Sequence, residues 1–156
     1  MRIGAGAGLF AGAVFAIMLV AAAAMNGQSP FLPLGMFASL LMGEGALHTL
    51  SSLPMVVGTL VTITLSMIFG AIYGVLIGFL SQQTRSNWAF EALAGLAFGA
   101  ALWLINFQVF GRLLFPWLAS GPQLVLVVAH TLFFGVPLGL IHATAAESDE
   151  AAPRED

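Results

Sequence analysis

The chain has 156 residues, of which 60% are hydrophobic and 7% charged, with a mean hydropathy of +1.01 and a net charge of −3. A soluble domain carries roughly a quarter charged residues, so this composition excludes a protein whose whole surface faces water. The absence of a basic patch excludes nucleic acid as a partner, and the absence of cysteine excludes disulfides and thiolate chemistry. We therefore predict an integral membrane protein with an all-α fold.

Four apolar segments are each long enough to cross the hydrocarbon core, which takes about 20 residues in a helix. The first resembles a secretory signal at its ends, but its apolar run is longer than that of a signal, so we interpret it as a span. The four spans predict one domain over 1–145, a four-helix transmembrane bundle, with spans at about 3–25, 53–80, 89–110 and 123–143.

A shorter helix is predicted between the first two spans, at about 34–48. Pro33 is typical of a first helical turn, and Glu44 and His48 lie four residues apart on one face. The opposite face is apolar, so we expect this helix at the outer membrane surface or over the bundle. Its apolar residues are Met36, Phe37, Leu40, Leu41 and Leu47.

Glycine recurs at every fourth residue in all four spans. This spacing places the glycines on one stripe of each helix, where backbones can approach closely, and it predicts Gly-xxx-Gly helix packing. The glycines concerned are Gly4, Gly8, Gly12, Gly70, Gly74, Gly78, Gly95, Gly99, Gly135 and Gly139.

Similar peptides recur between the spans. "AGLFAGA" at 7–13 resembles "AGLAFGA" at 94–100, and "FGAIYG" at 69–74 resembles "FGVPLG" at 134–139. These pairs predict a tandem repeat of two helical hairpins. The alternative is chance similarity among helices rich in Gly, Ala and Leu.

Four spans place both termini on one side of the membrane. That side holds Arg2, Arg85 and Arg154, whereas the other side holds Arg112. Because positive residues prefer the cytoplasmic side, we expect cytoplasmic termini. The last segment, 146–156, holds five of the seven acidic residues and is predicted to be a disordered tail.

Polar residues inside a membrane are the first candidates for function. Three spans and two loops are predicted to bring a set of them together in the outer half. We expect Arg112 to anchor its loop, with an ion pair to Glu44 as the alternative. The candidate site consists of His130, Asn106, Gln108, Thr62, Glu44, His48 and Arg112.

His130 has two interpretations. The favoured one is a neutral imidazole that hydrogen-bonds Asn106, a threonine or a carbonyl; the other is a group that titrates or contacts a ligand. His142 is expected at the wet cytoplasmic end, and Glu91 at the inner face beside Arg85. Pro137 is expected to kink the fourth span.

No cofactor or metal ligand set is predicted in the chain. A haem between two histidines would need an imidazole opposite His130 at matching depth, and only His48 remains. A histidine-rich metal site fails on the number of ligands for the same reason. The 13 phenylalanines are suited to contacts with lipid, quinone or pigment tails.

Four stretches carry a resemblance to known proteins: "LWLINF" (102–107), "FPW" (115–117), "AHTLFFG" (129–135) and "SPFLPLGMFASLLMGEGAL" (29–47). At these stretches the chain resembles a group of small bacterial four-span membrane proteins of unassigned function. The resemblance implies a location in the bacterial inner membrane and supplies no catalytic residues.

Two functions fit these features, and neither is enzymatic. The first is an accessory subunit of a larger membrane complex, of respiratory or photosynthetic type, in contact with lipids and other transmembrane subunits. The alternative is a small oligomeric transporter or channel with its polar site around His130 and Asn106. Against the transporter, no buried charge is expected in the inner half, where ion-coupled transport usually needs one.

Overall fold

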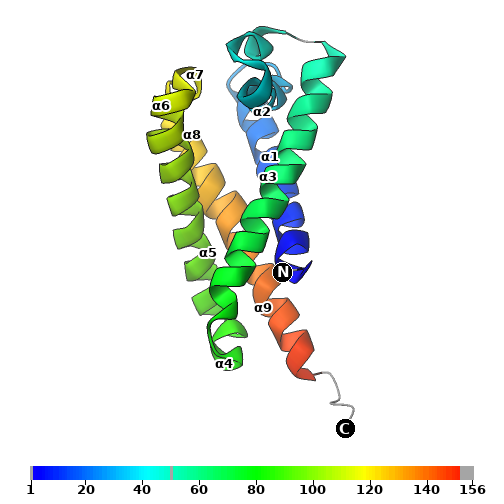
Figure 1. Ribbon diagram of the computed structural model, residues 1–156, viewed down its shortest axis with the longest axis vertical. Helices are drawn as coiled ribbons and strands as arrows, with labels where there is room; N and C mark the ends of the chain where they lie inside the picture. The colour runs from blue at the N-terminus through cyan, green and yellow to red at the C-terminus, as the bar shows by residue number, and fades with distance from the viewer. Residues whose placement is uncertain (1, 50, 152–156) are drawn as a thin grey trace.

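The computed structural model describes residues 2–49 and 51–151, and within them 88% of the chain is helical and no strand is present. Four helices are long and apolar enough to cross a membrane (Figure 1). This confirms the prediction of an all-helical chain with four long apolar helices. They are Ile3–Met25, Ser52–Gly78, Trp88–Leu114 and Gln123–Ser148.

The first two long helices are regular, whereas the last two each contain a π-helical segment. The elements of these four helices are α1 (Arg2–Met25), α3 (Ser52–Gly78), α5 (Trp88–Trp103) with η2 (Leu104–Gly111) and α6 (Arg112–Leu114), and α8 (Gln123–Val128) with η3 (Ala129–Gly135) and α9 (Val136–Ala151). Helix α9 thus continues through residues 146–151, for which the sequence predicted disorder. Residues 152–156 of that tail lie outside the described residues.

The connection between α1 and α3 folds as two helices instead of one over 34–48. Helix α2 (Leu32–Met42) has Pro33 in its first turn and ends before Gly43, and the 3-10 helix η1 (Glu44–His48) follows. The reason for the break is the backbone of Gly43, whose φ of 80° lies in the left-handed region that ends a helix. Two short helices, α4 (Gln82–Arg85) and α7 (Pro116–Ala119), complete the chain.

The four long helices pack as two hairpins. The first hairpin consists of α1 and α3 with α2 between them, and the second consists of α5 to α9 with η2 and η3. The two hairpins meet where α1 packs against η3 and α9. In Figure 1 the hairpins cross low in the view and diverge upward. We call the upper part, which holds α2, η1, α6 and α7, the loop end, and the opposite part, which holds α4, the terminal end.

Glycines lie at the closest helix contacts of both hairpins. A Cβ added at Gly8 of α1 would collide with the backbone of Gly70 in α3, and a Cβ at Gly95 of α5 would collide with that of Gly135 in η3. Backbones this close leave no room for a side chain between them. Gly78 differs, because nothing lies within 4 Å of a Cβ built there.

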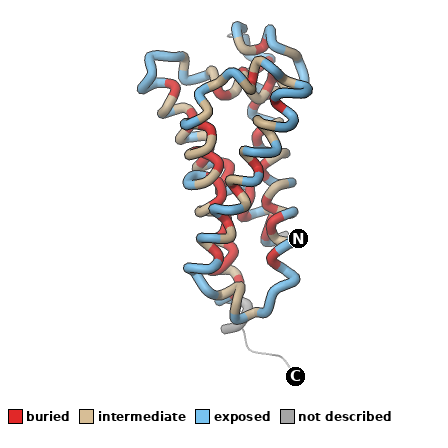
Figure 2. Tube along the Cα trace, turned by 90° about the vertical axis from the view of Figure 1, so that its left-hand side faces the viewer, coloured by how far each residue is buried: buried red, intermediate tan, exposed pale blue. Residues whose placement is uncertain are grey.

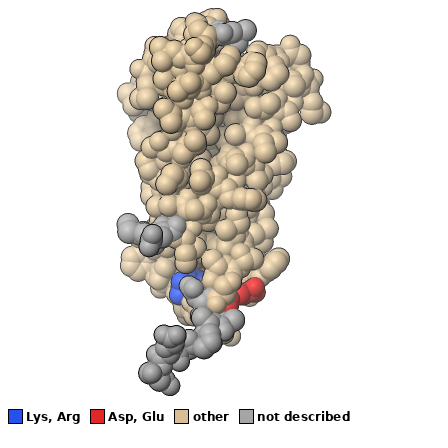
Figure 3. Space-filling model, turned by 90° about the vertical axis from the view of Figure 1, so that its right-hand side faces the viewer, with Lys and Arg blue, Asp and Glu red and all other residues tan. Residues whose placement is uncertain are grey.

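Apolar side chains cover the outside of the bundle. Buried residues follow the inward sides of the helices in Figure 2, while residues such as Ile17 (70% exposed) and Leu93 (68% exposed) point outward. The face in Figure 3 carries the charged side chains of its described residues near the terminal end, and the described residues above them are uncharged. Such a surface is suited to acyl chains along most of its length.

Candidate functional site

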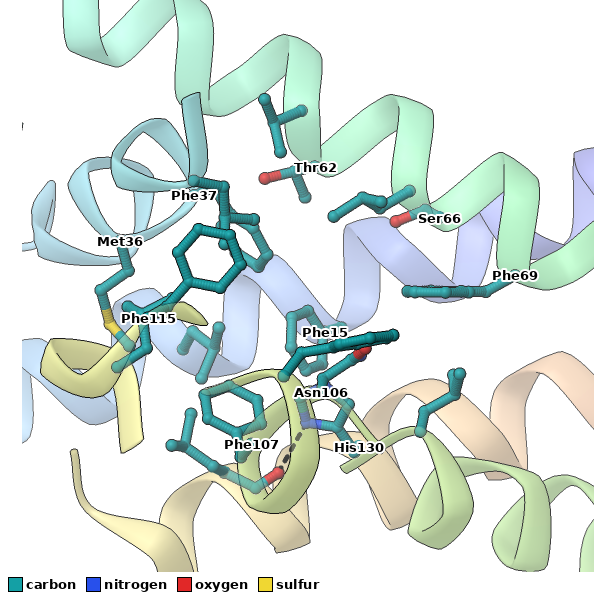
Figure 4. Close-up of a pocket in the computed structure, with 18 of the residues that line it drawn as sticks. Phe15, Met36, Phe37, Thr62, Ser66, Phe69, Asn106, Phe107, Phe115 and His130 are labelled. Carbon is teal, nitrogen blue, oxygen red and sulfur yellow. Dashed lines mark hydrogen bonds between the residues drawn. The ribbon is translucent and has the colours of Figure 1, made fainter. Parts of the chain in front are cut away.

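A cavity of about 550 Å³ lies between the two hairpins toward the loop end (Figure 4). Helices α1, α2 and α3 line one side, and α5, η2, α6, α7, α8 and η3 line the other. Seven of the 13 phenylalanines line it, so its walls are largely apolar. Its volume falls within the range of about 300–1,000 Å³ that is typical of small-molecule sites.

The cavity is open at the loop end. Leu41 of α2 and Leu114 of α6 both line it, yet they are 74% and 60% exposed. At this end the described residues of the two hairpins share one hydrogen bond, from the Trp117 indole of α7 to the Ser39 hydroxyl of α2 at 3.0 Å. The wall of the cavity thus includes residues of α2 and α6 that are exposed at the surface.

Both π-helical segments line the cavity. A π-helical turn accommodates one extra residue, and such turns occur often at functional sites. The second of them, η3, ends two residues before Pro137, and the N–H of Val136 donates to the Thr131 carbonyl five residues earlier. The structure therefore has a widened helix next to the proline, which has no N–H to donate, and the kink expected from the sequence stays a prediction.

His130 of η3 is buried in the cavity wall, with 7% of its surface exposed. Its Nδ1 donates to the Leu126 carbonyl at 2.8 Å, so in the neutral ring Nε2 carries the lone pair. The rings of Phe15 and Phe107 stand edge-on to the imidazole at 4.8 and 5.4 Å between centroids. The imidazole is thus held by its own helix and by two aromatic rings, and Nε2 has no hydrogen-bond partner within the described residues.

Two further predicted site residues line the cavity, Asn106 of η2 and Thr62 of α3. The Thr62 hydroxyl donates to the Gly58 carbonyl of its own helix at 2.8 Å. The Asn106 amide has no hydrogen bond to any described residue. Ser66 also lines the cavity and was missed by sequence reasoning, because a serine in a span is commonly bonded to its own helix.

The other four predicted site residues lie elsewhere. Gln108 donates to Gln123 at 3.0 Å in a separate polar contact between the third and fourth long helices. Glu44, His48 and Arg112 are exposed at the loop end and do not line the cavity. In the part of the chain that is described, Arg112 and Glu44 form no ion pair. The structure therefore brings together three of the seven.

A second polar cluster lies toward the terminal end. The Tyr73 hydroxyl of α3 donates to Oε2 of Glu91 in α5, and Nδ1 of His142 in α9 is 4.0 Å from Oε1 of the same carboxylate. The exposed fractions of the three residues are 1%, 0% and 6%. We call these three residues the inner cluster.

The inner cluster overturns the expectation that His142 lies in water. Helix α9 continues beyond it to Ala151, and α4 covers this end through a hydrogen bond from Gln82 to the Ala146 carbonyl at 2.6 Å. Sequence reasoning placed Glu91 at the inner face but missed its partners. The available signal was that Tyr73 and His142, like Glu91, interrupt apolar spans near the same membrane face.

The inner cluster has unused hydrogen-bonding capacity. Oε1 of Glu91 and Nδ1 of His142 are buried without hydrogen-bond partners. Buried polar atoms are rarely left unpaired, so an unpaired carboxylate oxygen opposite an unpaired imidazole nitrogen is unusual. Among the described residues, no group of three or more His, Cys, Asp or Glu side chains is placed to hold a metal ion.

Comparison with protein families, curated proteins and solved structures finds no match to this chain. Its own geometry defines a helical bundle with four membrane-length helices. An apolar cavity opens at the loop end of this bundle, and a buried ionisable cluster lies at the terminal end.

Proposed function

We propose that this chain is a small, non-enzymatic membrane transporter for an amphipathic molecule with a large apolar part and one hydroxyl-like head group. The observation that carries the proposal is the open cavity between the hairpins, with His130 and Asn106 among its few polar residues. Mostly apolar walls with a small number of placed polar groups are typical of sites for such molecules.

The polar groups of the cavity favour a hydrogen-bond donor in the head group. The lone pair on Nε2 of His130 can accept a hydrogen bond, and the Asn106 amide can both donate and accept. A hydroxyl can donate a hydrogen bond to His130 and accept one from Asn106, whereas the matching ether has no proton to donate. The apolar remainder of the molecule would contact the phenylalanine walls.

The inner cluster removes the main objection to transport. Ion-coupled transporters usually contain a buried ionisable group, and Glu91 is fully buried below the cavity. The sequence alone gave no reason to expect that burial. A buried carboxylate in the inner half therefore supports a transporter over a purely structural subunit.

We also propose that the two hairpins are a tandem repeat packed through Gly-xxx-Gly stripes, with the cavity between the repeats. The contact of Gly8 with Gly70 has a counterpart in that of Gly95 with Gly135. The offsets between these contacts, 87 and 65 residues, equal those between the similar peptides of the two halves. Transporters are often built from two repeats that move around a site between them.

The proposed location is the bacterial inner membrane, with both termini in the cytoplasm. Arg85 of α4 lies at the terminal end and Arg112 of α6 at the loop end, and Arg2 and Arg154 belong to the terminal side by sequence. This bias supports the proposed orientation. The cavity would then open toward the outer face.

An accessory-subunit role in a respiratory or photosynthetic complex is the second candidate. The observation that favours it is Gly78, which has open space around it and can accept a helix from another subunit. The other nine glycines of the predicted stripes already meet parts of this chain, so they offer no open surface to another subunit. A stable hetero-complex after purification in mild detergent would favour this candidate.

The test of the transporter uses the purified chain in lipid vesicles and two fluorescent probes, a long-chain alcohol and its methyl ether. We expect the chain to accelerate transfer of the alcohol more than that of the ether. Asn106→Leu should reduce alcohol transfer by about tenfold, the equivalent of one hydrogen bond of roughly 1.4 kcal/mol. Gln108→Leu is the matched control, because it removes a polar group from the same helical segment outside the cavity.

Equal transfer of alcohol and ether would contradict the proposed head-group recognition. Unchanged alcohol transfer in Asn106→Leu would remove this residue from the site. Transfer no faster than in protein-free vesicles would contradict the transporter itself.

A further inference from the structure

The inner cluster is a contact between the two hairpins. Tyr73 belongs to the first hairpin, whereas Glu91 and His142 belong to the second. We infer that Glu91 and His142 form a proton-binding site whose occupancy sets the strength of the Tyr73 contact and thereby the separation of the hairpins. This inference rests on the proposed transport function and names the ion that drives it.

The geometry leaves a place for one proton. Oε1 of Glu91 and Nδ1 of His142 are 4.0 Å apart, and neither has a hydrogen-bond partner, although both residues are more than nine-tenths buried. When the ring proton of neutral His142 is on Nε2, Nδ1 is an acceptor; a proton added to Oε1 of Glu91 then supplies the donor, and a small movement closes the hydrogen bond.

The proton balance is simple. One proton leaves a hydronium ion in the water at the terminal end and forms an O–H bond with Oε1 of Glu91, and no bond breaks in the protein. Tyr73 keeps its own proton, because its hydroxyl donates to Oε2, the other carboxylate oxygen. The cluster therefore gains one positive charge on binding and loses it on release.

Burial and charge act on the cluster in opposite directions. Burial favours the protonated carboxyl of Glu91, whereas Arg85 of α4 favours the ionised carboxylate and also acts on His142. The next acidic side chain of α9, Glu147, is held away by the Trp88 indole at 2.8 Å. Apart from Arg2, whose side chain lies outside the described residues, α1 carries no ionisable side chain. The cluster can therefore both bind and release a proton.

Proton binding would weaken the contact between the hairpins. A hydrogen bond to an ionised carboxylate is about twice as strong as one between neutral groups. The hydroxyl of Tyr73 therefore holds the hairpins together most firmly when the site is empty. The hairpins touch directly here, since a Cβ built on Gly74 of α3 would lie 3.3 Å from Nε2 of His142. Adding a proton loosens this contact, and the terminal end can open while the loop end closes.

The first experiment measures proton binding without any transported molecule. Infrared difference spectra of the full chain in lipid nanodiscs, between about pH 5 and pH 8, should contain the carbonyl band of a protonated buried carboxyl. Glu91→Gln should remove this band, and His142→Gln should move its midpoint by about one pH unit or more. Glu147→Gln, which removes an exposed carboxylate, is the matched control and should keep the band.

Absence of the band in the unmodified chain would overturn the proton site. Its persistence in Glu91→Gln, with the helical circular dichroism retained, would overturn it as well. A midpoint that stays unchanged in His142→Gln would show that the imidazole is not part of the site.

The second experiment measures the separation of the hairpins. The chain has no cysteine, so two cysteines can be introduced in one variant and spin-labelled, one at Met42 of α2 and one at Leu113 of α6. Both positions are exposed and do not line the cavity. We expect the distance between the labels to shorten from alkaline to acidic pH. Tyr73→Phe should keep the infrared band but abolish the distance change, because the proton site remains while the contact is lost.

A distance that does not depend on pH would overturn the coupling. These readouts also separate the two proposals. If the band and the distance change are present while the alcohol probe is not transferred, the transporter fails and the proton site stands. If the probe is transferred and the band is absent, the proton site fails and the transporter stands.

Discussion

Two glycines of α1, only two residues apart, should respond in opposite ways to the same substitution. A Cβ at Gly8 would collide with the Ser66 carbonyl and would lie 2.7 Å from the Cα and 3.0 Å from the nitrogen of Gly70. A Cβ at Gly6 meets nothing within 4 Å. Gly6→Ala is therefore a matched control for Gly8→Ala in the same helix.

The expected magnitudes follow from these contacts. Replacing glycine by alanine inside a helix stabilises it by roughly 0.5–1 kcal/mol, and this is the whole effect expected at Gly6. Overpacking destabilises by about 1–3 kcal/mol. The atoms met at Gly8 are mainly backbone and cannot rotate away, so the upper half of that range applies. The net result for Gly8→Ala is a loss of about 1–2.5 kcal/mol in the free energy of unfolding.

The assay is reversible unfolding of the purified chain by sodium dodecyl sulfate in mixed micelles, followed by the fluorescence of its three tryptophans. The free energy of unfolding should rise slightly for Gly6→Ala and fall for Gly8→Ala. If the two variants agree within about 0.5 kcal/mol, the close approach of α1 to α3 at Gly70 is not present in the folded protein.

Three further predictions concern other parts of the bundle. Tyr73→Phe should lower the free energy of unfolding by about 1–3 kcal/mol, because the buried carboxylate it bonds loses its donor; an unchanged value in the same assay would refute this. Ser39→Ala should lower the free energy of unfolding by about 1 kcal/mol, because the Trp117 indole loses the hydroxyl to which it donates; an unchanged free energy of unfolding would contradict this. A single cysteine at Gln83 should react with a membrane-impermeant maleimide in inside-out vesicles, whose outer surface is the cytoplasmic face, whereas one at Leu113 should react only in right-side-out vesicles. Labelling of both cysteines in the same vesicles would exclude the four-span topology.

The architecture followed from the sequence because hydrophobic length is a local property. About 20 consecutive apolar residues predict a spanning helix whatever they pack against, and all four predicted spans correspond to long helices. Pro33 likewise indicated the start of α2 by itself. The end of α2 at Gly43, where φ is 80°, was not predicted from the sequence.

The site was only partly readable from the sequence. His130, Asn106 and Thr62 were grouped by their depth along the spans, and depth follows from counting residues. Counting does not tell which side of a helix faces a neighbour. The π-helical segments η2 and η3 also change the rotation per residue, and with it the direction in which each side chain points. Gln108, two residues from Asn106, therefore faces Gln123 and not the cavity.

The inner cluster shows where local information ends. The sequence determined that Tyr73, Glu91 and His142 lie near one membrane face, because each is a fixed number of residues from the end of a span. That they meet, exclude water and leave two facing atoms unpaired was decided by the tertiary structure alone. The physical reason is that burial and hydrogen bonding depend on the rotation and crossing of three helices, and uniformly apolar helices carry little periodicity from which to infer them.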